Sequence, residues 1–302
     1  MKVFHHSRFA DVAALVAAKH GLRLAVCIPT LDEAQTIGTI STLIRQELME
    51  HHPLVDELLI IDSGSTDGTR EIAELAGARV FLSADIAAAE GTFRGKGENL
   101  WKALHATDCE LLCFIDGDIG NFTSRFVTGL VGPLLTDPDI GYVKAFYERP
   151  LTHPNGVRPT GGGRVSEILV RPLLSLFYPE LTVFLQPLSG EYAARREVFR
   201  SLDFPCGYGV ELAHLIDLSR SLGLDGIAQT DLDQRLHRNR SDEELGHMSF
   251  GILQVLFRRL QRDGKLDLHV SLPEWLQTWQ FDGENLIGSP LHLTEPERPA
   301  LH

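Results

Sequence analysis

Two carboxylates stand on either side of a glycine in the segment Phe114-Ile115-Asp116-Gly117-Asp118, directly after an apolar run. Like charges this close repel one another unless a cation lies between or near them. Hard divalent cations bind such carboxylate oxygens and commonly take diphosphate oxygens as further ligands. A bare Asp-x-Asp pattern is common in proteins, so its position at the end of a buried strand is what favours a metal site here.

Two glycine-rich segments carry a basic residue at the expected start of a helix. In Gly95-Lys96-Gly97-Glu98 the lysine is well placed for a phosphate. A solvated lysine in a turn is an equally good interpretation of that motif alone. In Gly161-Gly162-Gly163-Arg164-Val165-Ser166, free backbone N–H groups, an arginine and a hydroxyl converge. A flexible hinge is the alternative, but the glycine run ending in arginine favours a cradle for a phosphate or carboxylate.

A third basic segment, Arg235-Leu236-His237-Arg238-Asn239-Arg240, follows the last expected strand. If strand alternation continues, Arg235 and His237 share a face. Charge runs are usually solvated patches, and that interpretation stays open. In a chain with a formal net charge of −13, three arginines around one histidine favour an anion pocket, with His237 as a candidate metal ligand.

Three further segments give weaker signals. The acids of Pro29-Thr30-Leu31-Asp32-Glu33 favour recognition of a base or ribose. The alternative is that they only stabilise the N-terminus of a helix through its dipole. The small residues of Asp62-Ser63-Gly64-Ser65-Thr66-Asp67 allow close approach to a ligand, although Asp67 also suits a helix N-cap. Glu211 in Gly207-Tyr208-Gly209-Val210-Glu211 suits a substrate hydroxyl or, again, a helix dipole.

Two common nucleotide-binding patterns do not follow the expected strands. No Gly-Lys-Ser/Thr phosphate loop follows the second strand, and no Gly-x-Gly-x-x-Gly fingerprint follows the first. These absences weaken the hypotheses of a kinase, an ATPase or a dehydrogenase.

Strand and helix patterns alternate through the first half of the chain and predict a parallel sheet covered on both faces. Ligands bind such sheets beyond the carboxyl ends of the strands, so the polar residues that close each strand are the first candidates for chemistry. The expected strands are Leu22–Pro29, Glu57–Asp62, Arg79–Ser83, Glu110–Asp116 and Gly141–Tyr147, and the expected helices are Ala34–His51, Asp67–Ala76, Lys96–Ala106 and Ser124–Leu135.

The second half is less regular. Ser241 followed by Glu244 predicts a capping box at the start of a long amphipathic helix. We expect helices over Arg164–Phe177 (with a kink at Pro172), Val210–Leu222 and Ser241–Arg262, extended chain over Leu185–Ala194 and Ile227–Leu236, and a loose tail over Leu286–His302.

Composition bounds the class of protein. The chain has 302 residues, with 28 basic and 41 acidic side chains, and this acidic balance argues against general nucleic-acid binding. The apolar run Val12–Ala18 is too short to span a bilayer and is flanked by charges, so we expect an amphipathic surface helix. We expect buried free thiols at Cys27, Cys109, Cys113 and Cys206, which favours a reducing cytoplasm.

The motifs occur in the order found in one group of enzymes. Over roughly Leu22 to Met248 the sequence resembles the retaining GT-A glycosyltransferases that make glucosyl-3-phosphoglycerate, and the closely related mannosyl-3-phosphoglycerate synthases. The two motifs nearest the amino end, Pro29–Glu33 and Asp62–Asp67, occur in many GT-A enzymes. The triple-glycine, Tyr-Gly-Val-Glu and Arg-x-His-Arg-Asn-Arg motifs are far more specific. Two departures are Asp32, where asparagine is expected, and Gly117, where serine is expected. Both bear on contacts to the nucleotide or the sugar.

The resemblance implies transfer of glucose from UDP-glucose to 3-phosphoglycerate, with Mg²⁺ or Mn²⁺ held by Asp118 and His237. It implies attack from the leaving-group face without a nucleophile from the enzyme. The implied catalytic residues are Asp118, Glu211 and Arg235. The implied donor-binding residues are Pro29, Thr30, Leu31, Asp32, Glu33, Ser63, Lys96, Asp116, Gly117, Tyr208, Gly209, Val210, Glu211, Arg235 and Arg240. The implied acceptor-binding residues are Gly163, Arg164, Val165, Ser166 and Asn239.

The implied fold is α/β, a GT-A-type mostly parallel sheet with helices on both faces and a C-terminal helical extension. Its glycosyltransferase domain would span residues 1–240, with a nucleotide-sugar half at about 22–120, an acceptor half at about 121–240 and a helix and tail at 241–302. A homodimer in the cytoplasm without a nucleic-acid or membrane partner is expected.

Two alternatives stay open at this point. The first is a mannosyl enzyme that uses GDP-mannose. The second is a nucleotide-binding regulator on the same fold without turnover, against which the intact Asp118–His237 pair and the Arg164 cradle speak.

Overall fold

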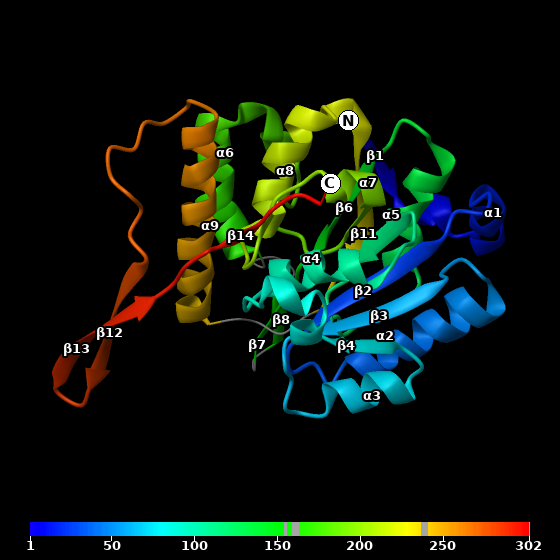
Figure 1. The fold of residues 1–302 in the computed structure, drawn as a ribbon, viewed down its shortest axis with the longest axis horizontal. Coiled ribbons are helices and arrows are strands. Elements are labelled where there is room, and N and C mark those ends of the chain that lie inside the picture. The colour runs from blue at the N-terminus through cyan, green and yellow to red at the C-terminus, as the bar shows by residue number, and fades with distance from the viewer. Residues whose placement is uncertain (154–155, 159–162, 237–240, 302) are drawn as a thin grey trace.

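The computed structural model describes residues 1–153, 156–158, 163–236 and 241–301. At its centre is an eight-stranded sheet in the order β1-β11-β6-β9-β5-β2-β3-β4 (Figure 1). Strand β9 runs antiparallel to β5 and β6, and the other neighbouring pairs are parallel. The strands are β1 (Lys2–His5), β2 (Leu24–Thr30), β3 (Glu57–Asp62), β4 (Arg79–Leu82), β5 (Leu111–Phe114), β6 (Tyr142–Glu148), β9 (Tyr192–Arg195) and β11 (Ile227–Gln234).

Helices cover both faces of the sheet, and strand alternation explains why. In β2, Ala25 and Cys27 belong to one core, and Val26 and Ile28 belong to the other, because successive side chains point to opposite faces. The first core packs against α4 (Lys96–Ala106), α6 (Arg171–Phe177), α7 (Arg196–Arg200), α8 (Val210–Ser221) and α9 (Asp242–Arg262). The second packs against α1 (Val12–Ala18), α2 (Ile37–Leu43) with its π-helical continuation Ile44–His51, α3 (Thr69–Leu75) and α5 (Arg125–Thr136).

The mostly parallel α/β fold expected from the sequence is therefore confirmed. The five strands expected in the first half all lie in the sheet, with ends that differ from the expected ones by a few residues. The surface helix α1 and the capping box of Ser241 are also confirmed. The edge strand β1 was not expected, and it pairs with β11 from the far end of the chain.

Two segments of the second half differ from expectation. Only β9 is extended within Leu185–Ala194, because the preceding residues form a turn closed by the Ser189 N–H donating to the Gln186 carbonyl. The irregularity expected at Pro172 is a π-helical stretch, Ser166–Val170, directly before α6. Proline lacks the N–H that an α-helical turn needs, which accounts for the change of geometry.

The expectation of a loose tail is wrong. Strands β12 (Trp275–Asp282) and β13 (Asn285–His292) form a hairpin that projects from the body of the molecule, and β14 (Glu297–Arg298) pairs with β10 (Phe204–Pro205) (Figure 1). The last residues pack on α4, where the Trp101 indole N–H donates to the Pro299 carbonyl at 3.1 Å. Trp101 and Pro299 are 198 residues apart in sequence, so no local sequence pattern indicates this contact.

A short hairpin of β7 (Leu151–His153) and β8 (Gly156–Arg158) completes the strands. The expected buried thiols are confirmed, since all four cysteines are free and buried. Among the described residues no helix combines the length and the apolar character that a membrane span requires.

Candidate active site

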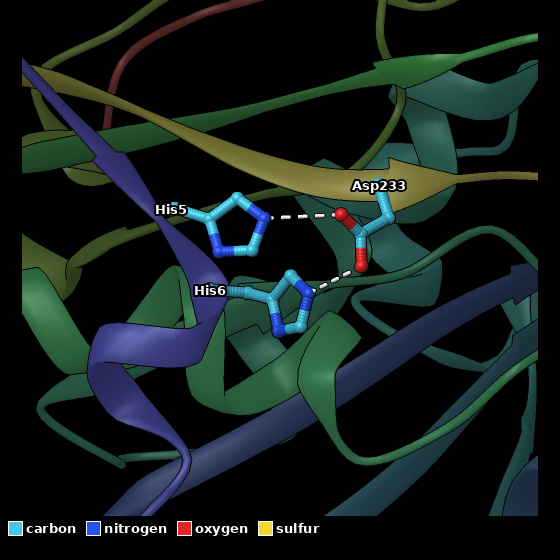
Figure 2. A group of neighbouring side chains, drawn as sticks. All are labelled: His5, His6 and Asp233. Atoms are coloured by element: carbon cyan, nitrogen blue, oxygen red, sulfur yellow. Dashed lines mark hydrogen bonds and ion pairs between the residues drawn. The ribbon is translucent and has the colours of Figure 1, made fainter.

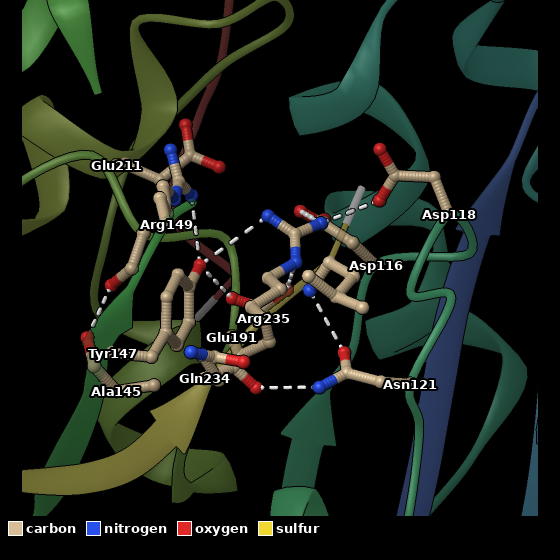
Figure 3. A network of polar contacts seen from close by, with 12 residues as sticks. Asp116, Asp118, Asn121, Ala145, Tyr147, Arg149, Glu191, Glu211, Gln234 and Arg235 are labelled. Carbon is tan, nitrogen blue, oxygen red and sulfur yellow. Dashed lines mark hydrogen bonds and ion pairs between the residues drawn. The ribbon is translucent and has the colours of Figure 1, made fainter. Parts of the chain in front are cut away.

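Five predicted residues meet beyond the carboxyl ends of the parallel strands (Figure 3). The Arg235 guanidinium, just after β11, lies 3.0 Å from Asp116 Oδ2 and also donates to Asp118 Oδ1. The Lys96 ammonium donates to Asp116 Oδ1 and lies 2.9 Å from Glu211 Oε1. Because β5 and β11 run in the same direction, the residues that follow them lie at the same edge of the sheet. The sheet thus gathers four separate motifs into one charged cluster.

A second layer of buried groups supports Arg235, and the motifs did not predict it. Arg235 Nε lies 3.2 Å from Glu191 Oε1, and the Tyr147 hydroxyl donates to Glu191 Oε2. Arg149 in turn donates to the Tyr147 hydroxyl at 2.8 Å (Figure 3). Glu191 is completely buried and Arg235 nearly so. Arg235 also donates to the Tyr147 hydroxyl at 3.3 Å, so Glu191 and Tyr147, together with Asp116 and Asp118, hold the guanidinium at one place and orientation.

Electrostatics keep the cluster charged. Burial alone would raise the pKa of Asp116, but Lys96 and Arg235 outweigh it and hold that pKa well below its usual range. Burial alone would lower the pKa of Lys96, but Asp116 and Glu211 raise it above its usual range. Both groups are thus ionised at neutral pH. Burial raises the pKa of Glu191, despite the neighbouring Arg235.

Glycine at position 190 is a steric requirement of this cluster. A Cβ atom there would lie 2.2 Å from Lys96 Nζ and 2.3 Å from Asp116 Oδ2, which is closer than atoms can approach. A Cβ at Gly97 would lie 1.8 Å from the Pro205 carbonyl oxygen. The Gly97 of the Gly-Lys-Gly-Glu motif is thus explained by packing against β10, whereas Lys96 itself points to the cluster.

Lys144 of β6 is a further buried cation that no motif indicated. Its ammonium donates to the Ser189 carbonyl at 2.8 Å, and burial lowers its pKa to about 7. A single lysine inside an apolar strand forms no motif with its neighbours, so the sequence does not indicate a role for it. Only the packing of β6 against the turn before β9 reveals it.

The Pro29–Glu33 and Asp62–Asp67 motifs contact one another through hydrogen bonds beside the cluster. Asp32 has φ +58° and accepts a hydrogen bond from Thr66 N–H at 2.9 Å, while its own N–H donates to Ser65 Oγ at 2.8 Å. The Glu33 N–H donates to Thr69 Oγ1 at 2.8 Å. Asp62 is buried beneath this surface and accepts the N–H groups of the loop that follows it. The acids of these motifs thus order two loops against one another.

Gly117 joins this surface to the cluster. A Cβ there would lie 3.2 Å from Glu33 Cγ, and Thr36 Oγ1 donates to the Gly117 carbonyl at 2.5 Å. Ser63, the other predicted donor contact in this region, accepts a hydrogen bond from Asn99 at 2.8 Å. Gly117 therefore packs beside Thr30 and Glu33, and Ser63 lies next to the same segment because its N–H donates to the Thr30 carbonyl at 2.9 Å.

The Gly207–Glu211 segment is held by Glu295, which belongs to the segment Leu286–His302 that was expected to be a loose tail. The Gly207 N–H donates to Glu295 Oε2 at 2.8 Å, and a Cβ at Gly209 would lie 2.4 Å from Val255 of α9. Val210 is completely buried and belongs to the hydrophobic core on this face of the sheet. Glu295 is a positioning residue that sequence reasoning missed.

The predicted acceptor segment lies beside the start of α9. Gly163 has φ +78°, which marks a turn, and Arg164 is paired with Asp242 of α9. Val165 and Ser166 are buried in the helix that follows. The remaining predicted ligands His237, Asn239 and Arg240, with Gly161 and Gly162, lie outside the described residues.

The fold and the cluster together define a class of protein, the GT-A glycosyltransferases. Residues 25–187, more than half of the chain, match the family described as Glycosyl transferase family 2. The glucosyl-3-phosphoglycerate synthase of Petrotoga mobilis is 47% identical over 99% of this chain and 92% of its own length. That of Mycobacterium tuberculosis is 49% identical over 88% of this chain and 81% of its own length. The chain belongs to the family of glucosyl-3-phosphoglycerate synthases.

Solved structures agree with this assignment. The M. tuberculosis glucosyl-3-phosphoglycerate synthase in complex with Mn²⁺, UDP-glucose and phosphoglyceric acid superposes with a TM-score of 0.85 and 41% identity, covering 100% of this chain and 98% of that one. The mannosyl-3-phosphoglycerate synthase of Rubrobacter xylanophilus gives a TM-score of 0.90 at 33% identity, covering 99% and 96%. The fold is thus common to both types of enzyme, and identity is higher to the glucosyl type.

Proposed function

We propose that this chain transfers glucose from UDP-glucose to 3-phosphoglycerate with retention of configuration at the anomeric carbon, giving glucosyl-3-phosphoglycerate. The observation that carries the proposal is the cluster of Lys96, Arg235, Asp116 and Asp118 on a chain 47–49% identical to glucosyl-3-phosphoglycerate synthases. Two anchored cations beside ionised carboxylates suit a diphosphate leaving group.

The donor is proposed to bind along the region from Pro29 to Asp116. The nucleotide would lie on Pro29 to Glu33 and Ser63, with the diphosphate beside Lys96 and Arg235. As the glycosidic bond breaks, negative charge grows on the β-phosphate. Lys96 and Arg235 are already held in place by Asp116, Glu191 and Glu211, so stabilising this charge needs no rearrangement of the cations. Tyr208 to Glu211 and Arg240 would complete the sugar–diphosphate site.

Asp118 and His237 are proposed as ligands of Mg²⁺ or Mn²⁺. Asp118 fits such an ion because it offers hard oxygen ligands and its side chain is 24% exposed at the rim of the cluster. The ion supplies Lewis-acid neutralisation of the diphosphate when it is bound.

The acceptor is proposed to bind on Gly163 to Ser166 and Asn239. A phosphate and a carboxylate make 3-phosphoglycerate strongly anionic, and Arg164 offers the charge-assisted hydrogen bonds that such groups take. Arg164 is partly exposed and paired with Asp242, whose carboxylate the acceptor would replace.

We propose attack from the leaving-group face rather than a glycosyl-enzyme intermediate. Asp116, Asp118, Glu191 and Glu211 each have a cationic partner, Lys96 or Arg235. A carboxylate neutralised in this way is a poor nucleophile, which supports direct attack by the acceptor hydroxyl.

The chain organisation and location are part of the proposal. Residues 1–240 would form the glycosyltransferase domain, with residues 22–120 taking the nucleotide sugar and residues 121–240 the acceptor, and residues 241–302 would form a C-terminal helix and tail. Four buried free thiols support a reducing cytoplasmic location.

A homodimer is proposed to form through the hairpin of β12 and β13. Trp279, Phe281 and Leu286 are exposed on one face of this hairpin, because Trp279 and Phe281 are two residues apart and Leu286 pairs with Phe281. A two-stranded hairpin is marginally stable alone in water, so burial against a second copy would stabilise it. Light scattering should give twice the chain mass for the wild type and for Leu75→Asp on α3, and the monomer mass for Trp279→Asp.

The test of the function is a donor panel with 3-phosphoglycerate and Mg²⁺. We expect the highest kcat/KM with UDP-glucose, and retention at the anomeric carbon by NMR of the product. A higher value with GDP-mannose would place the protein with the mannosyl enzymes, which share its fold at a TM-score of 0.90. No product with any donor would favour a nucleotide-binding regulator.

A further inference from the structure

Two histidines and an aspartate converge at the edge of the sheet, outside the cluster described above (Figure 2). His5 Nε2 lies 3.0 Å from Asp233 Oδ1, and His6 Nε2 lies 2.6 Å from Asp233 Oδ2. The three candidate ligand atoms lie within 4.8 Å of one another. In a tetrahedral site with metal–ligand bonds of about 2.0 Å, ligand atoms lie about 3.3 Å apart. The spacing therefore fits one ion after small side-chain movements.

Adjacent residues of a strand would point to opposite faces, so the local fold must bring both rings to one side. His5 ends β1 and His6 begins a 3₁₀ turn (His6–Phe9), and the two rings lie 4.5 Å apart between centroids. His6 packs on α5, where a Cβ at Gly129 would lie 3.1 Å from the His6 Cβ. The turn and the absence of a side chain at position 129 thus orient His6.

The carboxylate is also held in place. Asp233 has φ +63°, an unusual value for a residue other than glycine, and it lies where the register of β11 shifts between Asp231 and Gln234. The Arg125 guanidinium donates to the carbonyls on either side, those of Leu232 at 3.0 Å and Gln234 at 3.1 Å. The backbone around Asp233 is therefore fixed with its carboxylate toward the histidines (Figure 2).

His5 has the outer partner that metal-binding histidines usually have. Its Nδ1 accepts the Ser7 N–H at 3.3 Å and lies 2.8 Å from Ser7 Oγ. With a metal on Nε2, the ring proton would move to Nδ1 and be donated to this hydroxyl. Two imidazoles and one carboxylate suit Zn²⁺ and similar transition metals, whereas Mg²⁺ prefers oxygen ligands and keeps water. Three protein ligands leave a fourth position for water.

We propose that His5, His6 and Asp233 form a binding site for Zn²⁺ or a chemically similar transition metal, separate from the site of the catalytic ion. The ion would join β1 at the amino end of the chain to the end of β11, two residues before Arg235. The bound ion would hold the ends of β1 and β11 together at the sheet edge, in addition to the parallel pairing of the two strands.

The test is zinc binding to the full chain without a histidine tag, by calorimetry in excess Mg²⁺ and UDP, which occupy the catalytic site. We expect the wild type to bind one more equivalent of Zn²⁺ than His5→Gln/His6→Gln, and Asp233→Asn to lower the affinity of this site tenfold or more. Zn²⁺ should also raise the Tm of the wild type more than that of the double variant. An intense visible absorption band with Co²⁺ in the wild type, absent from the double variant, would show a four-coordinate site that depends on the two histidines.

His292→Gln is the matched control, because His292 is an exposed histidine paired with Glu274 at 3.2 Å elsewhere on the surface. This variant should bind as much Zn²⁺ as the wild type. Equal zinc stoichiometry in the wild type and the double variant would overturn the proposal. Normal far-UV circular dichroism of the double variant would show that such a loss is not unfolding.

Discussion

Arg298, near the carboxyl end of the chain, donates to both carboxylate oxygens of Glu98, at 2.7 and 2.8 Å. Both side chains are buried, and Glu98 belongs to the Gly-Lys-Gly-Glu motif at the start of α4. This pair fixes the end of the chain beside the helix that carries Lys96. The acid of that motif thus serves the tertiary structure, while its lysine faces the charged cluster.

Replacing Arg298 by methionine should destabilise the protein strongly. Glu98 would remain buried without its main partner, and breaking a buried pair in this way costs about 3–5 kcal/mol. Urea unfolding at pH 7 would measure the loss. Arg79→Met is the matched control, since Arg79 is 57% exposed beside Glu57 and its loss should cost less than about 1 kcal/mol. Equal effects of the two substitutions would contradict a structural role for the tail.

Asp118→Asn should lower kcat by about 100-fold or more in Mg²⁺, because it removes a hard oxygen ligand beside the diphosphate. The fold should be unaffected, since Arg235 keeps Asp116 and Glu191 as partners. Product formation and a thermal melt would measure the two quantities. Exposed Asp139→Asn should retain wild-type kcat. Full wild-type activity in excess EDTA would refute the metal requirement.

Arg164→Ala should raise the KM for 3-phosphoglycerate with little change in the KM for UDP-glucose. Loss of a charge-assisted contact of about 1.5–3 kcal/mol corresponds to roughly a 10- to 150-fold rise. Initial rates with each substrate varied in turn would separate the two effects. Asp242→Asn removes the present partner of Arg164 and should leave the acceptor KM unchanged or lower. An equal rise for both substrates would assign Arg164 to something other than the acceptor.

Glu295 should make stability depend on pH. Burial is the main cause that raises its pKa from 4.5 to about 7, so between these values the folded chain binds this proton more tightly than the unfolded chain. Its contribution to the free energy of unfolding therefore falls as pH rises through this window. Relative to Glu295→Gln, the wild type should lose up to about 3 kcal/mol of stability from pH 5 to pH 8.

Urea unfolding of both proteins at the two pH values tests this prediction. Exposed Glu284→Gln in the hairpin turn should follow the wild type. A difference between wild type and Glu295→Gln that is the same at pH 5 and pH 8 would show that Glu295 does not titrate in this range.

Local sequence patterns were sufficient for the five strands of the first half and for the polar residues that follow them, but not for the edge strand β1. Apolar runs such as that of β5 end in polar residues, and parallel strands present those ends together. Strand ends indicated Asp116 and Arg235, and helix starts indicated Lys96 and Glu211. The family resemblance placed all four in the donor site, and the structure joins them.

Only tertiary structure decided which groups hold that cluster in place. Glu191 and Tyr147 support Arg235, and Glu295 holds Gly207, yet none of them lies in a recognisable motif. The role of a buried polar residue depends on partners far along the chain. The residues next to it in sequence do not indicate which partners those are. The tail illustrates the same limit: its proline and polar content indicates disorder, but burial of Glu295 and Arg298 against distant partners orders it.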